Sequence, residues 1–217
     1  MRNDFIEVPA NKMSFAKRKL VEGAGVNDSI YKTSGKDEEG RDTKCPYYRV
    51  WHGMIERCFS KKYHLKRPTY KNCTVSEDWL RFSSFRKWMK SQNWQGMELD
   101  KDIKIIGNKK YSPETCLFVS KMVNLLLCDS AAIRGEWPIG VSFKKSKNKF
   151  VANCKNKGEQ RHLGYFLTSQ EAHNAYKLYK HKVILETANQ SENSYIREYL
   201  LNHAELLVIK IDQEGES

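Results

Sequence analysis

Cysteine thiols are the first side chains in this 217-residue sequence whose type and spacing suggest a specific chemistry. The six cysteines are Cys45, Cys58, Cys73, Cys116, Cys128 and Cys154. None of them has the C-x2-C spacing of a zinc knuckle, and without an export signal we do not expect disulfides. The four from Cys45 to Cys116 fall within one candidate domain, where they could converge on a structural Zn2+ ion. The alternative, which the spacing favours, is that each is a separate buried thiol that packs as a small hydrophobic side chain.

Lysine and arginine side chains give the second chemical signal. The chain has 38 of them against 26 acidic residues, a formal charge of +12. The excess is uneven, because 131–190 carries +7, 191–217 carries −4 and 1–130 carries +9. Such an excess indicates a polyanionic partner, with nucleic acid ahead of a membrane surface. The alternative is a basic protein that has no such partner.

Composition and apolar patterning restrict the class of protein. Hydrophobic residues make up 40% of the chain and aromatic residues 12%, which is enough for a packed core. No stretch approaches the roughly 20 apolar residues of a membrane span. The N-terminal segment 1–20 lacks the apolar region of a signal peptide. We therefore expect a soluble, cytoplasmic protein with no membrane partner.

The first half of the chain reads as a polar segment followed by a compact α+β module. Residues 1–44 read as a flexible or extended lead-in and 45–130 as a domain. Its expected elements are a helix from Pro46 to Cys58, a second helix from Ser76 to Met89, strands at 97–106 and 117–119, and a short helix to Cys128. Those elements must position any reactive side chain of this module.

The second half has a different pattern. Three short strands are expected at 139–143, 149–154 and 161–166, followed by a helix that starts with a capping box at Thr168 and Glu171. The economical interpretation of 131–190 is a three-stranded antiparallel sheet packed on one helix. Beyond it we expect a helix at 194–206, a strand or extension at 206–211, and an acidic tail. The segment 191–217 could contact a protein partner or a second copy of the chain.

Residues 136–182 contain, in this order, the motifs Gly140-Val141, Phe150-Val151-Ala152, Leu163-Gly164-Tyr165-Phe166, Thr168, Glu171-Ala172 and Ala175-Tyr176. With these motifs the segment resembles the plant ethylene-response-factor type of DNA-binding domain. The resemblance implies that the sheet enters the major groove of double-stranded DNA. The outward-facing candidates are Ser142, Lys144, Lys149, Asn153, Lys155, Arg161 and His162.

Most of those candidates would contact phosphates, whereas Asn153 and Arg161 are the types that read adenine and guanine edges. Phe150 stands where the family has Trp, and the strands carry less Arg than the family pattern. Both departures bear on which bases the domain would read, and not on whether it binds DNA. The alternative is a solvated basic face on an unrelated small domain.

Residues 45–128 contain the motifs YRVWHGMIERC, YKNCTVSEDWLRFSSFRKWM and LDKDIKIIGNKKYSPETCLFV. With these motifs the segment resembles the phage-encoded HNH homing endonuclease family. The resemblance implies a ββα-metal module that holds Mg2+ or Mn2+, with Asp100 as the first ligand and Asn124 as the ligand on the helix. Lys101 falls where the general-base His is expected and Thr115 where the Asn that orients it is expected. Asp102, two residues along the expected strand, would face the same way as Asp100 and could be a second ligand.

These resemblances lead to two hypotheses about function. The first is a DNA-binding, divalent-metal-dependent HNH-type endonuclease that hydrolyses phosphodiester bonds, in the host bacterial cytoplasm if phage-encoded. The second is a catalytically inactive HNH-derived protein that binds DNA or regulates it. The departures at Lys101 and Thr115 favour the second, and the retained Asp100, Asp102 and Asn124 favour the first. An RNA-binding or partner-inhibiting role is a further alternative.

Overall fold

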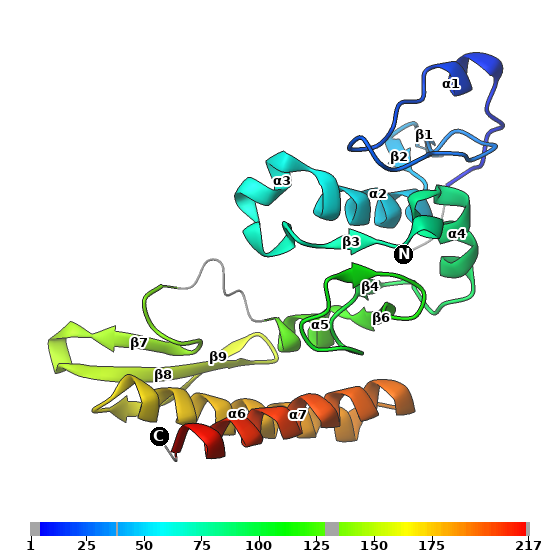
Figure 1. Ribbon diagram of the computed structural model, residues 1–217. Helices are drawn as coiled ribbons and strands as arrows, with labels where there is room; N and C mark the ends of the chain where they lie inside the picture. The colour runs from blue at the N-terminus through cyan, green and yellow to red at the C-terminus, as the bar shows by residue number, and fades with distance from the viewer. Residues whose placement is uncertain (1–4, 38, 129–134, 216–217) are drawn as a thin grey trace. The chain divides into compact units, whose positions relative to one another are not determined.

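The computed structural model describes residues 5–37, 39–128 and 135–215, the last stretch with side chains to Val208 (Figure 1). The protein has a mixed α+β fold with small sheets. It divides into two compact units, Met1–Ser120 and Lys121–Ser217, which are described separately below. The domain boundary expected at residues 130 and 131 lies outside the described residues.

The first unit is built from short helices and three two-stranded sheets. Its helical segments are α1 (Lys12–Ala16), α2 (Pro46–Phe59), α3 (Lys61–Lys66), η1 (Pro68–Tyr70), η2 (Glu77–Leu80) and α4 (Phe82–Lys90). Its strand pairs are antiparallel β1 (Ser34–Lys36) with β2 (Asp42–Lys44), parallel β3 (Thr74–Val75) with β5 (Lys110–Tyr111), and antiparallel β4 (Met97–Asp100) with β6 (Leu117–Ser120).

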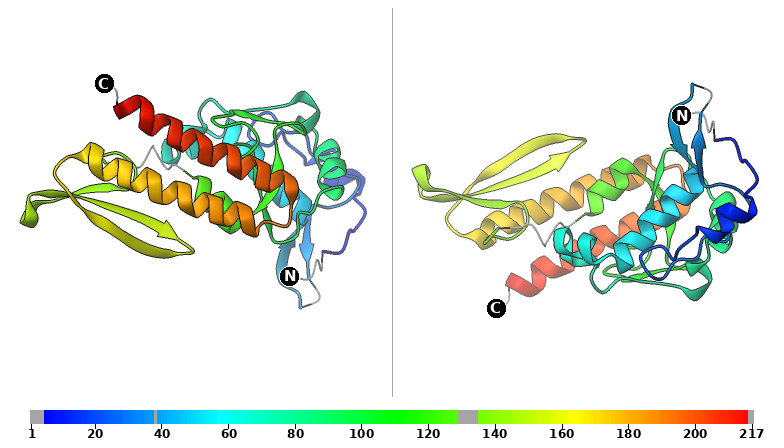
Figure 2. Two further views of the ribbon diagram at one scale, coloured as in Figure 1. Left: turned by 90° about the horizontal axis from the view of Figure 1, so that it is seen from below. Right: turned by 90° about the horizontal axis from the view of Figure 1, so that it is seen from above.

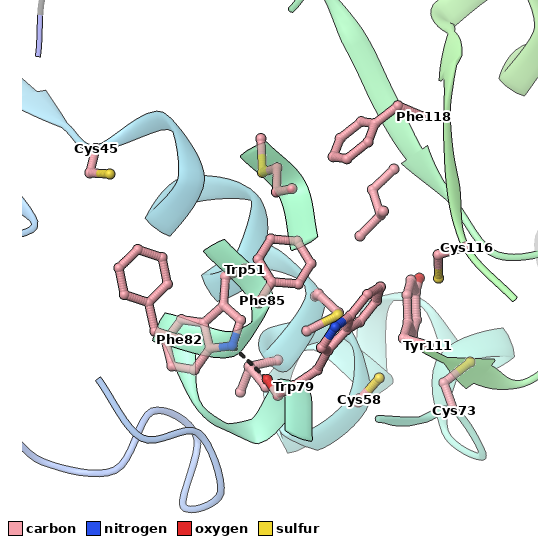
Figure 3. Packing of buried hydrophobic residues seen from close by; sticks show 14 of the residues in the cluster. Cys45, Trp51, Cys58, Cys73, Trp79, Phe82, Phe85, Tyr111, Cys116 and Phe118 are labelled. Atoms are coloured by element: carbon pink, nitrogen blue, oxygen red, sulfur yellow. Dashed lines mark hydrogen bonds between the residues drawn. The ribbon is translucent and has the colours of Figure 1, made fainter. Parts of the chain in front are cut away.

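Helix α2 confirms the expected amphipathic stripe and forms the centre of the core. Its buried side chains are Trp51, Met54, Ile55 and Cys58, at helical spacings of three and four residues. The Trp51 indole N–H donates a hydrogen bond to the Trp79 carbonyl oxygen at 2.7 Å, so the largest buried side chain also satisfies its polar atom (Figure 3). The core thus fixes η2 against α2.

The expected helix from Ser76 to Met89 is interrupted. It consists of η2 and α4, separated by Arg81, whose backbone is extended with φ −92° and ψ 127°. Arg81 forms a parallel β-bridge with Val26, and the Phe82 N–H donates to the Val26 carbonyl oxygen at 3.0 Å. A pairing with a residue 55 positions earlier therefore overrides the local helical pattern.

The segment expected as a flexible or extended lead-in contributes to the core of the first unit. Tyr31 is buried, and its ring packs edge-on against Phe82 at 6.5 Å between centroids. The Arg18 guanidinium donates hydrogen bonds to the carbonyl oxygens of Ser29, at 2.6 Å, and Tyr31, at 3.0 Å. The polar composition of residues 1–44 does not predict this folding, because only a few side chains, among them Tyr31 and Arg18, hold the segment in place.

The second unit contains the expected three-stranded antiparallel sheet and two long helices. Its elements are α5 (Lys121–Leu127), β7 (Val141–Lys144), η4 (Lys145–Lys147), β8 (Lys149–Asn156), β9 (Glu159–Phe166), α6 (Ser169–Gln190) and α7 (Ser194–Gly215). The strand order is β7-β8-β9, and α6 contacts all three strands. The capping box at Thr168 and Glu171 is confirmed as the start of α6.

Helix α7 corrects the expectation for the end of the chain. Residues 206–211, expected as a strand or extension, belong to this helix, which packs alongside α6 (Figure 2). Leu200 and Ala204 are its buried side chains among those described. None of the described helices has the length and apolar character that a membrane crossing requires.

Candidate functional site

The sheet of the second unit has one face against α6 and one face away from it. Ala152 and Cys154 on β8 are buried on the α6 side. Side chains alternate along a strand, so Lys149, Asn153 and Lys155 lie on the opposite side. Ser142 and Lys144 of β7 join them, because they pair with Val151 and Lys149. We call the side defined by these five residues and His162 the outer face.

A bulge in β9 decides which of its residues belong to the outer face. Gly164 pairs with Ala152, whereas the next pair along the ladder is Asn153 with His162, so Leu163 is the extra residue. His162 therefore shares the outer face with Asn153. Arg161 pairs with Cys154 and points to the other side of the sheet.

The expectation that Arg161 faces outward is thus wrong. A register shift of one residue exchanges the faces of every side chain beyond it. Arg161 is exposed, yet it is not positioned to act together with Lys149, Asn153 and Lys155.

Two further side chains belong to this surface and were missed in the sequence. Tyr165 pairs with Val151 and is 38% exposed, with the Lys147 Nζ 3.9 Å from the centroid of its ring. Its ring also meets the His162 ring edge-on at 4.8 Å. Alternation along β9 places Tyr165 on the side opposite to Phe166, which is a signal that the sequence contains.

The two faces of the sheet predict different effects for substitutions of two basic side chains, Lys155 and Arg161. If the outer face binds a DNA duplex, Lys155→Gln should weaken that binding and reduce the slope of log K against log[salt] by about 0.9, the value for one lost phosphate contact. Arg161→Gln removes the same charge from the opposite face and should leave the slope unchanged. Fluorescence anisotropy titrations across a salt series measure both. Equal effects of the two substitutions would contradict the register of β9.

The expected catalytic cluster lies at the end of β4 in the first unit. The strand ends at Asp100, whereas a strand over 97–106 was expected. The Asp100 carboxylate accepts hydrogen bonds at Oδ1 from the N–H groups of Asp102, at 2.8 Å, and Ile103, at 2.7 Å, which turns the chain. Asp102 is therefore not two positions along a strand from Asp100, and the strand argument for a shared face fails. Burial raises the pKa of Asp100, and those N–H bonds oppose the shift.

Lys101 is a buried cation whose hydrogen-bond partners are all within its own loop, and its Nζ also lies 5.9 Å from the centroid of the Tyr111 ring. Its side chain is 7% exposed, and Nζ lies 2.7 Å from both carboxylate oxygens of Asp102 and 2.7 Å from the Asn108 carbonyl oxygen. The Asn108 side chain donates back to the Lys101 carbonyl oxygen at 2.8 Å. The ammonium group thus closes the loop from Asp100 to Lys110.

This arrangement does not fit a divalent metal ion on Asp102. The Lys101 ammonium occupies the position between both oxygens that a bound cation would take, and its charge would repel such an ion. Within the described residues, no group of three or more His, Cys, Asp or Glu side chains could hold a metal. The carboxylates of Asp100 and Asp102, expected as metal ligands, instead accept the hydrogen bonds that hold the loop together.

Thr115 holds a turn, whereas Asn124 lies on a helix, as the resemblance implied. The Thr115 hydroxyl donates to the Lys110 carbonyl oxygen at 2.7 Å and lies 3.1 Å from the Ser112 hydroxyl, so it holds the turn before β6. Asn124 lies on α5, which begins directly after β6 and belongs to the second unit.

The cysteines expected as zinc ligands do not converge. Cys45 is the N-cap of α2 and Cys58 lies in its last turn, which separates them by about 20 Å at 1.5 Å per residue. Cys58, Cys73 and Cys116 lie on the side of the core near Tyr111 (Figure 3). Burial raises the pKa of Cys58 and of Cys116 to about 12, and it also raises the pKa of Cys73. Buried thiols of this kind pack as small hydrophobic groups.

Comparison of the chain with protein-family models, curated proteins and solved structures returns no match. The functional assignment therefore rests on the geometry of the outer face and of the Asp100 loop.

Proposed function

We propose that the protein binds double-stranded DNA through the outer face of the sheet β7–β9. The observation that carries this proposal is the division of one sheet into two unlike faces. Helix α6 covers the side with Ala152 and Cys154, while the outer face presents lysines, Asn153 and His162. A twisted antiparallel sheet of this width can enter the major groove and direct alternate side chains to the DNA.

The charge of the outer face supports a phosphate partner. Lys144, Lys149 and Lys155 are exposed, and no ion pair neutralises them among the residues the structure describes. Lysines at the rim of the sheet would contact phosphates, which gives affinity and steep salt dependence. Asn153 on the central strand is the type of residue that reads an adenine edge.

Cleavage by an HNH-type endonuclease is the second candidate function. The order of an antiparallel strand pair, β4 with β6, followed directly by helix α5 supports it, as does the place of Asp100 at the end of β4. The bonds of Lys101, Asp102 and Thr115 oppose it, since these side chains are engaged in holding loops. We therefore rank the non-cleaving DNA-binding protein first.

The binding proposal is tested by neutralising the outer face. The variant Lys144→Gln/Lys149→Gln/Lys155→Gln should bind a duplex at least about tenfold more weakly near physiological salt, because three phosphate contacts and their counterion release are lost. The matched control is Lys12→Gln/Lys17→Gln/Lys19→Gln, which removes three exposed charges from the first unit. Equal affinity of the two variants would contradict the proposal.

Incubation of the protein with supercoiled plasmid and with longer natural DNA, in Mg2+ or Mn2+, tests whether it cleaves DNA. We expect no nicks from the wild-type protein under conditions where DNA is fully bound. Nicks that are abolished by Asp100→Ala would instead establish the second candidate. Nicks that persist in Asp100→Ala would reject both the non-cleaving assignment and the role of Asp100.

A further inference from the structure

The stretch from Arg57 to Ser76 is a basic segment that the outer face does not include. It contains no acidic residue, and its basic residues are Arg57, Lys61, Lys62, Lys66, Arg67 and Lys71. Apart from Arg57, these lie on α3 or in the turns that adjoin α3 and η1, and their side chains are exposed. The segment lies wholly in the first unit.

Tertiary structure adds two more lysines to this segment. Strand β3 pairs with β5 in parallel, which places Lys110 opposite Thr74. The Lys109 Nζ donates a hydrogen bond to the Thr69 carbonyl oxygen in η1 at 3.2 Å. We define the α3 patch as the seven exposed cations Lys61, Lys62, Lys66, Arg67, Lys71, Lys109 and Lys110.

In the described part of the first unit, the cations of the α3 patch have no carboxylate partner, whereas several other cations of the unit do. Lys36, Arg41, Arg81 and Arg86 each form an ion pair with an aspartate or glutamate. Within residues 5–37 and 39–120, none of the seven patch cations forms such a pair. Seven cations without ion pairs, on a segment and on the strand that pairs with it, give this part of the unit a positive potential.

Arg57, in the last turn of α2, adds a further positive charge directly before α3 in the chain. Burial lowers its pKa, but the neighbouring Tyr111, Tyr70 and Tyr63 raise it by more. Burial raises the pKa of Tyr111 well above its ordinary value, so this phenol stays neutral and does not cancel the arginine charge. The charge of Arg57 therefore reinforces the surface.

We infer that the α3 patch is a second anchoring surface for the sugar–phosphate backbone of double-stranded DNA. The inference rests on the proposed function, and it adds a contact that the sheet does not make. Lysine ammonium groups bind phosphates as point charges without reading bases. Two anchoring surfaces on one chain would raise the overall affinity for a single DNA molecule beyond that of either surface.

The aromatic groups of the segment favour a duplex over a single strand. Proteins that hold single strands stack bases on available aromatic rings. Tyr63 and Tyr70 instead pack edge-on against each other at 5.6 Å between centroids, and both are only partly exposed. The patch therefore offers charge without a stacking platform.

The test compares two triple variants of the full chain with equal loss of charge. Lys66→Gln/Arg67→Gln/Lys71→Gln should reduce the slope of log K against log[salt] for a duplex by up to about 3, at about 0.9 for each lost phosphate contact. The control Lys12→Gln/Lys17→Gln/Lys19→Gln should keep the wild-type slope. Hydroxyl-radical footprinting should show that the patch variant loses part of the protected backbone and keeps the part assigned to the sheet.

The outcomes separate this inference from the proposed function. If the wild-type protein does not bind duplex DNA, the proposed function fails. If the outer-face variant loses binding while the patch variant matches the control in slope and footprint, only the second surface is rejected. An effect of the patch variant on RNA without an effect on duplex DNA would also overturn it. Should the patch variant unfold, Lys61→Gln/Lys62→Gln/Lys110→Gln gives the same test with different residues.

Discussion

Gly140→Ala should destabilise the second unit by about 3 kcal/mol, the upper range for forcing extra volume into a packed site. Gly140 has φ +80°, and a Cβ atom there would lie 2.1 Å from Cδ2 of the Tyr176 ring. Tyr176 is buried on α6, so its ring cannot move aside without opening the contact between sheet and helix. The backbone conformation adds its own cost for any residue other than glycine.

Gly158→Ala is the control for the backbone contribution. Gly158 has φ +89°, but nothing lies within 4 Å of its Cβ position. This substitution should cost only about 1 kcal/mol, the cost of the left-handed conformation. Urea unfolding of both variants, with amide hydrogen exchange on β8 and α6, measures the difference. Equal destabilisation would show that Tyr176 does not pack closely on Gly140.

The substitution at Gly140 should also affect DNA binding. The Gly140 carbonyl oxygen accepts a hydrogen bond from the Asn153 N–H at 2.8 Å, so it anchors the outer-face residue at the centre of the sheet. Duplex affinity of Gly140→Ala should therefore fall together with stability.

Asp102→Ala should destabilise the first unit by about 2 kcal/mol, because it leaves the buried Lys101 ammonium without its carboxylate. Breaking a fully buried pair costs about 3–5 kcal/mol, but the Asp102 side chain is 46% exposed, so water will partly replace it. Lys101→Met removes the charge and keeps the apolar stem, and it should cost about 1 kcal/mol or less.

The double variant Lys101→Met/Asp102→Ala completes the cycle. It should be more stable than Asp102→Ala alone, because no buried charge remains to be satisfied. Urea unfolding of the wild type, the two single variants and the double variant gives the coupling free energy between the Lys101 and Asp102 side chains. Additive effects of the two substitutions would show that the Lys101 and Asp102 side chains do not depend on each other, and would reopen the role of Asp102 as a metal ligand.

Periodic patterns made several elements predictable from sequence. The stripe of Trp51, Met54 and Ile55 defined α2, since apolar residues at spacings of three and four can share a face only in a helix. Thr168 and Glu171 defined the start of α6 through a capping box, a local arrangement that needs no distant partner. The three strands of the second unit followed from apolar runs separated by lysine-rich turns.

Non-local contacts decided the parts that sequence patterns missed. The bridge of Arg81 to Val26 divided an expected helix, and the bulge at Leu163 turned Arg161 away from Asn153. The Asp100 carboxylate ended a strand by accepting two N–H bonds. Each depends on a pairing whose register or geometry a residue pattern alone does not specify.

The sequence by itself therefore determined the net charge, the amphipathic helices and the strand pattern, because these depend only on residue type and spacing. Only the tertiary structure decided which charges act together. It placed His162 beside Asn153, joined Lys109 and Lys110 to the α3 patch, and engaged Lys101 with Asp102. The physical reason is that strand register and burial, unlike composition, determine which side chains share a surface and which are used for folding.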